Sequence, residues 1–275
     1  MNKLSNEKRR AVVSCLVESN SIRATVRMTG VAKATVTKLL VDLGTRCDMY
    51  QRLDPVGLNC KRIQCDRIWS FVYAKEKNAP IEKKLDGTAG DVWTWTAIDA
   101  DSKLGVSRLV GERNASVAHA FVSDVASRIA NRIQLTTDGN RLYLDAVDAA
   151  FGMDIDYAML IKVFGDAPEG QRRYSPAPVT GAVKSRIMGK PDFAHVSTSY
   201  VERQNLTMQM SMRRFTRLTN GFSKKTENLA AAVALHFMHY NFAWIHQTLR
   251  ITPAIEAGIS DHVWSIDEVV ALLDT

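Results

Sequence analysis

The sequence predicts a mixed α/β fold, a five-stranded sheet with flanking helices, preceded by a small all-α helix-turn-helix unit. The 275 residues are 46% apolar and 24% charged, which is typical of a globular chain with a sizeable core. Short helical periods fill the first 45 residues, and strand and helix periods then follow in the order βββ-α-β-α-β-α. We therefore expect a helix-turn-helix domain (1–45), a linker (46–59), a core (60–225) with a basic insertion (166–197), and a C-terminal helical segment (226–275).

The N-terminal unit is expected to contain three helices, at residues 7–18, 21–29 and 32–43. Ser21 can cap the second helix, and Gly30 supplies the turn before the third. Two helices joined by a short turn with Gly describe a helix-turn-helix, although any small three-helix module has similar spacing. The polar side chains of the third helix would point outward and enter a major groove; these are Lys33, Thr35, Thr37 and Lys38.

The core is expected to begin after a linker marked by Asp54-Pro55 and Gly57. Five segments have the β-branched and aromatic composition of strands: 65–73, 92–98, 104–110, 132–136 and 157–164. Five others have helical period: 116–131, 141–151, 199–218, 226–249 and 266–273. We expect loops at 78–91 and 166–195, the second rich in Pro, Gly, Arg and Lys and forming a loop or hairpin excursion.

The net charge of +7 is unevenly distributed along the chain. Residues 1–58 contain ten Lys and Arg against five Asp and Glu, and residues 171–225 contain eleven against two. Two basic blocks on either side of an acidic middle indicate a polyanion held at two places, and nucleic acid is the usual polyanion. The alternative is a solvated basic face.

The sequence also points away from a membrane or secreted protein. The longest apolar run, 229–235, is far shorter than the roughly 20 residues that span a bilayer. The N-terminal residues are charged, with no apolar signal core behind them. The four cysteines show no CxxC pair and no zinc spacing, which fits reduced thiols in the cytosol.

Three acidic residues occupy positions from which a metal site could be built. Asp66 is expected at the start of the first strand, Asp138 at the end of the fourth, and Glu202 on the basic helix. If strands one and four are neighbours, the two aspartates meet at one sheet edge and the helix brings Glu202 over them. Three converging carboxylates repel each other without a cation, and their oxygens are ligands that Mg²⁺ prefers. Each residue alone has a structural explanation as a turn, a strand cap or a solvated position.

The resemblance to a known family becomes specific in four segments. These are CDRIWSFVYAKEKN (65–78), TTDGNRLY (136–143), STSYVERQNLTMQMSMRRFTRLTNGFSKK (197–225) and HYNFAWIHQTLRITPA (239–254). From Asp66 onward the chain resembles the transposases of small bacterial insertion elements, in the Insertion Sequence One family. That family belongs to the DDE transposases and integrases, which have a ribonuclease-H-like core.

The resemblance implies a function and a site. The family's catalytic and metal-binding triad corresponds to Asp66, Asp138 and Glu202. It implies two Mg²⁺ ions (Mn²⁺ in substitution), DNA cleavage at the element's terminal repeats and strand transfer into target DNA. It also implies a homodimer or larger complex in a bacterial, cytoplasmic and nucleoid-associated protein.

A second set of residues is expected to contact DNA. Asn205 and Gln209 share the helix face of Glu202, and Arg203 is its neighbour in sequence. Basic residues further along could neutralise phosphates: Arg213, Arg214, Arg217, Lys224 and Lys225. The alternative for this run is a solvated helix end.

Two other functions stay open at this point. A ribonuclease-H-like nuclease or resolvase would share the metal site and cut without joining. A helix-turn-helix transcriptional regulator would need a ligand pocket and would have no use for three converging carboxylates.

Overall fold

The structure is a computed structural model that describes residues 4–166, 177–216 and 220–275. Its N-terminal helices are α1 (Asn6–Val17), α2 (Ile22–Thr29) and α3 (Lys33–Leu53). The side chain of Ser21 accepts a hydrogen bond from the Ala24 N–H at 3.1 Å, and Gly30 ends α2 in the left-handed conformation with φ +67°. Ser21 therefore caps the start of α2 and Gly30 ends it, as the sequence predicts.

The third helix is longer than the sequence predicts. α3 continues to Leu53, so the expected linker at 46–59 is helical over its first half. The additional turns of α3 pack against α8 (Thr226–Met238). The two helices cross so closely that a Cβ on Gly44 would lie 2.6 Å from the Ala231 Cα. Glycine permits this close approach, and the partner helix supports turns whose own hydrophobic period is weak.

The sheet has six strands in the order β3-β2-β1-β4-β5-β6. Its strands are β1 (Arg62–Val72), β2 (Gly90–Asp99), β3 (Gly105–Gly111), β4 (Ile133–Asp138), β5 (Ile155–Phe164) and β6 (Val179–Met188). β4 is parallel to β1 and β5, and the other neighbours are antiparallel. The first five strands are those predicted, but five is the wrong number. β6 lies in the expected basic insertion, and because most of its residues are exposed no buried alternation marks it.

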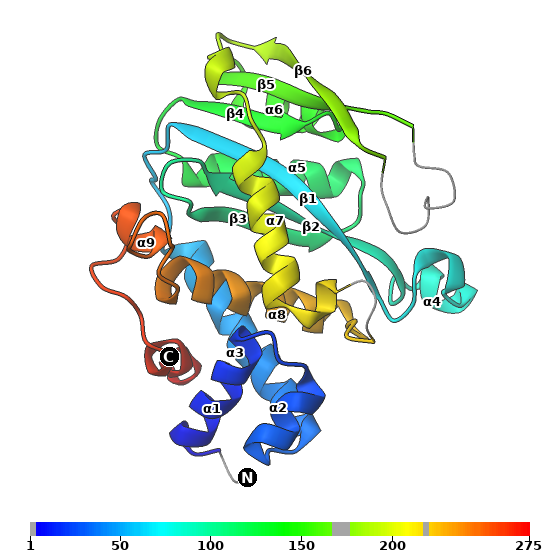
Figure 1. The fold of residues 1–275 in the computed structure, drawn as a ribbon, viewed down its shortest axis with the longest axis vertical. Helices are drawn as coiled ribbons and strands as arrows, with labels where there is room; N and C mark the ends of the chain where they lie inside the picture. Colours follow the sequence, from blue (N-terminus) through cyan, green and yellow to red (C-terminus); the bar gives the residue numbers. More distant parts are fainter. Residues whose placement is uncertain (1–3, 167–176, 217–219) are drawn as a thin grey trace.

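Helices cover both faces of the sheet (Figure 1). α5 (Ala115–Arg128) and α6 (Leu142–Phe151) lie behind it, and α7 (Ser199–Ser211) crosses in front of β1. The expected loop at 78–91 contains the short helix α4 (Ile81–Leu85). The smaller helical turns are η1 (Glu76–Asn78), η2 (Phe193–His195), η3 (Arg213–Phe215), η4 (His239–Ala243), α9 (Pro253–Glu256), α10 (Ile266–Ala271) and η5 (Leu272–Asp274).

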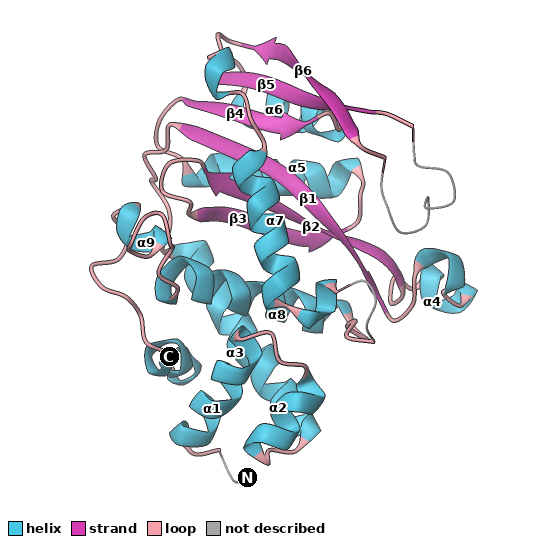
Figure 2. Cartoon of the chain, viewed as in Figure 1, coloured by secondary structure: helices cyan, strands magenta, loops and turns pink. Residues whose placement is uncertain are grey.

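Two long helices end earlier than predicted (Figure 2). α7 stops at Ser211, where Met212 adopts an extended conformation, and η3 follows as a separate turn. α8 stops at Met238 and continues as the π-helical turn η4. No described helix has the length and apolar content needed to cross a bilayer.

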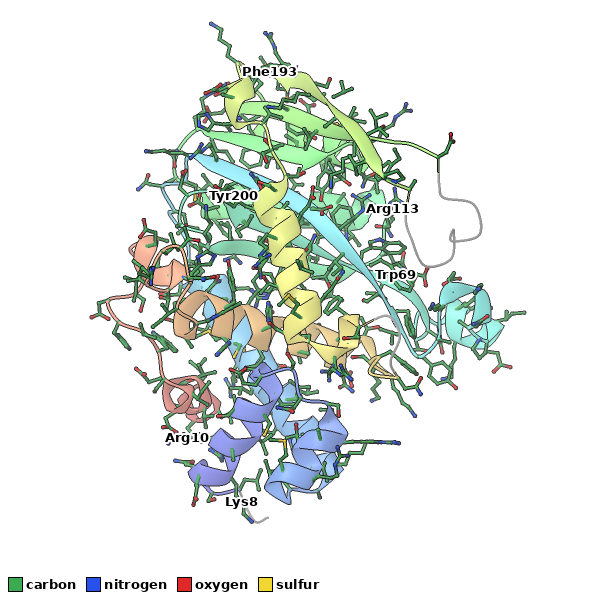
Figure 3. The ribbon with its side chains drawn as sticks, in the orientation of Figure 1. Lys8, Arg10, Trp69, Arg113, Phe193 and Tyr200 are labelled. Atoms are coloured by element: carbon green, nitrogen blue, oxygen red, sulfur yellow. The ribbon has the colours of Figure 1, made fainter. Side chains whose placement is uncertain are left out.

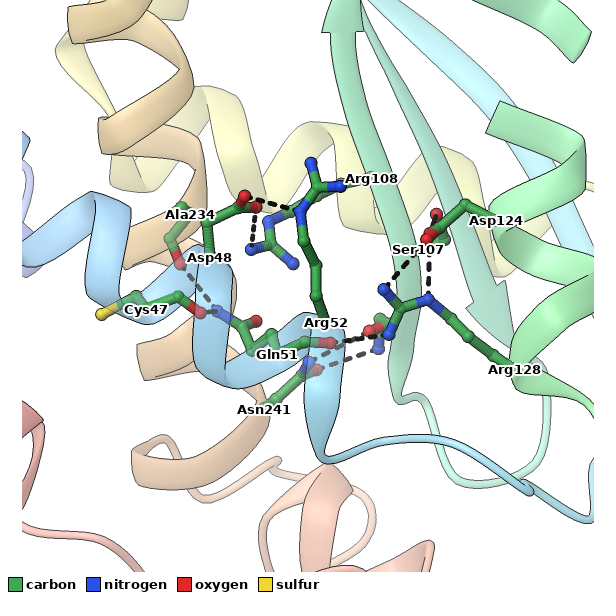
Figure 4. Close-up of polar contacts among 11 residues, drawn as sticks. Cys47, Asp48, Gln51, Arg52, Ser107, Arg108, Asp124, Arg128, Ala234 and Asn241 are labelled. Carbon is green, nitrogen blue, oxygen red and sulfur yellow. Dashed lines mark hydrogen bonds and ion pairs between the residues drawn. The ribbon is translucent and has the colours of Figure 1, made fainter. Parts of the chain in front are cut away.

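A buried polar junction ties α3 to the core (Figure 4). The guanidinium of Arg128 contacts both oxygens of Asp124, at 2.9 and 3.1 Å, and donates to the Gln51 carbonyl at 2.6 Å. Asp48 on α3 accepts from Arg108 of β3 at 3.0 Å. The N-terminal helices are therefore held to the α/β core by contacts along α3.

Candidate active site

The register of β1 and β4 brings Asp66 level with Asp138. Cys65 pairs with Thr137 in the parallel ladder, and the two aspartates are the next residue on each strand. Adjacent parallel strands lie about 4.8 Å apart, so their backbones meet here. The expectation that strands one and four are neighbours is met. One detail differs, since β1 begins at Arg62 and Asp66 lies within the strand rather than at its start.

Helix α7 is fixed to this part of the sheet by a side chain of β1. The Gln64 Oε1 accepts hydrogen bonds from the Tyr200 and Val201 N–H groups, at 2.9 and 3.2 Å. Figure 3 shows Tyr200 at the end of α7 that meets β1. Further along α7, the Asn205 Nδ2 donates to the Asp66 Oδ2 at 2.9 Å. The start of α7 therefore has a set position above the aspartates.

Glu202 lies on α7 one turn before Asn205, so both side chains share a helix face. One carboxylate oxygen accepts from the hydroxyl of Thr198, and the other is 2.6 Å from the Lys162 Nζ on β5. Lys162 is two residues beyond Leu160, which pairs with Asp138. Glu202 is thus directed at the same end of the sheet as the two aspartates.

Two cations outside the predicted site residues pair with these carboxylates. The Arg67 Nη1 lies 3.0 and 3.1 Å from the two oxygens of Asp138, and Lys162 pairs with Glu202. No motif marks Arg67, although it directly follows Asp66. Lys162 carried a signal, because it is the one charged residue in the otherwise apolar segment YAMLIKVF (157–164).

The pKa of Asp66 depends on its burial and on the charges of the other two carboxylates. Burial raises the pKa of Asp66 from its ordinary value to about 6. A backbone hydrogen bond at Arg67 and the Arg67 charge oppose this, while the charges of Asp138 and Glu202 raise the pKa further. All three carboxylates are therefore within electrostatic reach of one another.

The site contains oxygen donors of the kind that bind a divalent cation, but these donors are not arranged around a common point. Among the residues that the structure describes, no three His, Cys, Asp or Glu side chains are grouped to hold a metal ion. Asp138 and Glu202 are turned toward Arg67 and Lys162 instead. Beside them, the buried Asn205 Oδ1 has no hydrogen-bond partner in the described chain. Carboxylate and amide oxygens are what Mg²⁺ or Mn²⁺ prefers, and the two cations would have to leave first.

The residues expected to contact DNA near α7 have mixed surroundings. Arg203, Arg213 and Lys224 are exposed, and Gln209 is half-buried. Asn205 is buried and bonded to Asp66, so its side chain faces the aspartate rather than solvent. Arg217 lies outside the described residues.

Two of the basic residues in this set have partners within the chain. The Arg214 Nε donates to the Ser223 hydroxyl at 2.8 Å, and burial lowers the Arg214 pKa to about 10. Lys225 pairs with Glu227 at 3.1 Å. Arg214 is thus half-buried, with its Nε bonded to Ser223, and its contact with a DNA phosphate stays a prediction.

The residues expected to enter a major groove lie at the start of α3. Lys33 and Lys38 are exposed, and Thr35 and Thr37 are half-buried. Lys38 pairs with Asp42 one turn later, at 2.6 Å. All four side chains thus keep some access to solvent.

Comparisons with known proteins add little to this geometry. No family model matches the chain, and no curated protein matches it. Among solved structures, it is similar to a piggyBac transposase in a synaptic complex with hairpin DNA, with a TM-score of 0.35 and 10% sequence identity. That match covers 99% of this chain and 72% of the other. A similarity this low supports no conclusion about activity.

Proposed function

We propose that the protein is a DDE-type DNA transposase of a bacterial insertion element, which cleaves the element's ends and transfers them to target DNA. The observation that carries the proposal is the pairing of β1 with β4, which sets Asp66 beside Asp138 beneath the helix that carries Glu202. The resemblance of four segments to Insertion Sequence One transposases supports the finer assignment. The proposed function requires three partners: the DNA ends of the element, target DNA and a second copy of the chain. It also places the protein in the bacterial cytoplasm.

In this proposal Asp66, Asp138 and Glu202 hold two Mg²⁺ ions, with Mn²⁺ as a substitute. Bound ions of this kind polarise an attacking oxygen and stabilise the leaving oxygen of a phosphodiester. The chain's own residues set the geometry. Asn205 orients the Asp66 carboxylate, and Gln64 fixes the start of α7 on the sheet. Lys162, which is 35% exposed, is placed to neutralise a phosphate oxygen of the bound strand once it is released from Glu202, whereas Arg67 stays over the buried Trp95 ring.

The proposal is tested by incubating purified protein with Mg²⁺ or Mn²⁺ and a labelled duplex that carries the ends flanking its gene. We expect cleavage followed by joining to a target duplex. Asp138→Asn should abolish both steps and leave duplex binding intact. Cleavage without joining would make the protein a ribonuclease-H-like nuclease instead. Duplex binding without chemistry in either protein would indicate a transcriptional regulator and end the catalytic assignment.

A further inference from the structure

Part of the first basic segment of the sequence and the last residue of the second, Lys225, line a single open groove that holds three lysines and two carboxylates. One wall comes from the start of α3, with Lys33, Ala34, Thr37, Lys38, Val41 and Asp42. The other wall comes from the start of α8, with Lys225, Glu227 and Asn228. The charge pattern of the sequence predicts a polyanion held at two places, one at each segment. The fold instead puts the outward face of α3 opposite the residues that follow the candidate catalytic helix.

The walls of this α3–α8 groove are held at a fixed separation. The two helices cross where Gly44 meets Ala231, an approach that leaves no room for a Cβ on Gly44. Two turns further along α3, the Gln51 Nε2 donates to the Ala234 carbonyl at 3.1 Å. A ligand in the groove therefore meets both walls as one preformed surface.

The lysines in the groove can leave their carboxylate partners and bind another anion. Lys38 pairs with Asp42 and Lys225 pairs with Glu227, and both lysine side chains remain more than two-thirds exposed, at 68% and 69%. Exposed pairs of this kind contribute little to stability, so the lysines can turn to another anion at small cost. Lys33 has no ion-pair partner among the residues that the structure describes. Thr37 and Asn228 add neutral donors and acceptors between the lysines.

We propose that one DNA duplex occupies the α3–α8 groove, so that Lys225 and Asn228 of α8 share its recognition with the start of α3. This inference rests on the proposed function for the identity of the ligand. Lysines on both walls offer cations to phosphates, and Thr37 and Asn228 offer donors and acceptors to base edges. The carboxylates of Asp42 and Glu227 hold the lysines in the free protein and can accept from cytosine amino groups in the complex. The DNA-recognition surface then extends beyond the N-terminal helices into the segment joined to α7.

The test is fluorescence anisotropy of the full-length protein with one short duplex of the element's end, without divalent cations. Lys38→Ala and Lys225→Ala should each weaken binding roughly three- to tenfold and each lower the salt slope by about one. Asn228→Ala should weaken binding to the end duplex more than to an unrelated duplex. Lys77→Ala, which removes an exposed lysine of η1 outside both basic segments, is the matched control and should bind like the wild type.

Each outcome bears on the groove. If Lys38→Ala weakens binding and Lys225→Ala behaves like the control, α8 is not part of the surface and the inference is wrong. It is equally wrong if the wild-type protein does not bind the duplex. The binding assay contains no divalent cation, so its result does not depend on whether the protein cleaves DNA. If the protein cleaves DNA but binds it without Lys225, the groove inference is wrong and the proposed transposase function stands. Thermal unfolding of each variant confirms that it is folded.

Discussion

The junction at α3 and the candidate active site use the same chemistry, cations paired with carboxylates, in opposite ways. In the junction, Arg128 is only 5% exposed, and its guanidinium is bonded to Asp124 and to the Gln51 carbonyl. Burial acts to raise the pKa of Asp124, yet hydrogen bonds from Arg128 and Ser107 bring it below its ordinary value. In the candidate site, Lys162 and Glu202 are 35% and 37% exposed, whereas Arg67 and Asp138, at 10% and 34%, are about as buried as the junction pair.

The two regions also differ in how far their polar atoms are satisfied. Near the carboxylates, the buried Asn205 Oδ1, Arg67 Nε and Asn140 Nδ2 lack hydrogen-bond partners in the described chain, whereas in the junction only the Gln51 Oε1 does. Native structures rarely leave buried polar atoms unpaired unless a site has another use for them. The junction is therefore a closed structural contact, whereas the candidate site contains one exposed pair that can be exchanged, Lys162 with Glu202, and several unsatisfied polar atoms.

The largest expected effect is on stability, when the ion pair of the junction is removed. Arg128→Met should lower the free energy of unfolding by about 3 kcal/mol, because it leaves Asp124 without its main counter-charge in a partly buried position. Urea denaturation measures the loss. Arg132→Met removes an exposed arginine that also pairs with aspartates, and it should cost less than about 1 kcal/mol. Equal losses in the two variants would contradict a structural role specific to the junction.

The helix crossing beside the junction gives the next effect. Gly44→Ala should destabilise the protein by about 2 kcal/mol, because the new Cβ would overlap the backbone of Ala231 and force α3 and α8 apart. Gly181→Ala on β6 introduces the same methyl group into open space and should change stability by less than about 0.5 kcal/mol. Thermal unfolding of both variants decides the point. A stable Gly44→Ala protein would mean that the two helices are not tightly held.

The smallest effect concerns the exchangeable pair in the candidate site. Lys162→Met removes the cation that competes for Glu202, so Mn²⁺ should bind more tightly, by up to roughly fivefold, the ceiling for a pair this exposed. Isothermal titration calorimetry measures the affinity. Lys184→Met removes an exposed lysine of β6 and should leave it unchanged. Weaker Mn²⁺ binding in Lys162→Met would show that the lysine supports the ion site instead of competing for it.

Much of the α/β core could be predicted because its strands alternate or are apolar where they are buried. The five predicted strands are present, and the position of Asp66 beside Asp138 follows from their order. β6 could not be predicted, since an exposed edge strand has no buried face to leave a pattern. The length of α3 depends on α8, almost two hundred residues away, and no local period encodes that contact.

The candidate site could be predicted only in part for a similar reason. Spacing and strand order indicate which carboxylates share a sheet edge, and Asn205 was found through its place on the Glu202 face. The partners of the carboxylates depend on side-chain directions across three elements. Arg67 therefore emerges only from the fold, and so do the partner of Lys162 and the contact of Arg214 with Ser223.

The most direct test of the central claim, that the carboxylates serve chemistry and not stability, is Asp66→Asn measured for unfolding and for cleavage on the same preparation. The folded pKa of Asp66, about 6, lies above the unfolded value near 3.8, so ionisation costs the metal-free wild type stability as the pH rises through 6. In EDTA the variant should be more stable by about 2 kcal/mol at pH 7.5, and the gap should close near pH 4. With Mg²⁺ its cleavage should fall on the order of a thousandfold. Asp145→Asn, on the exposed side of α6, should change neither quantity. An Asp66→Asn protein that loses stability and activity together, or that still cleaves DNA, would contradict the account.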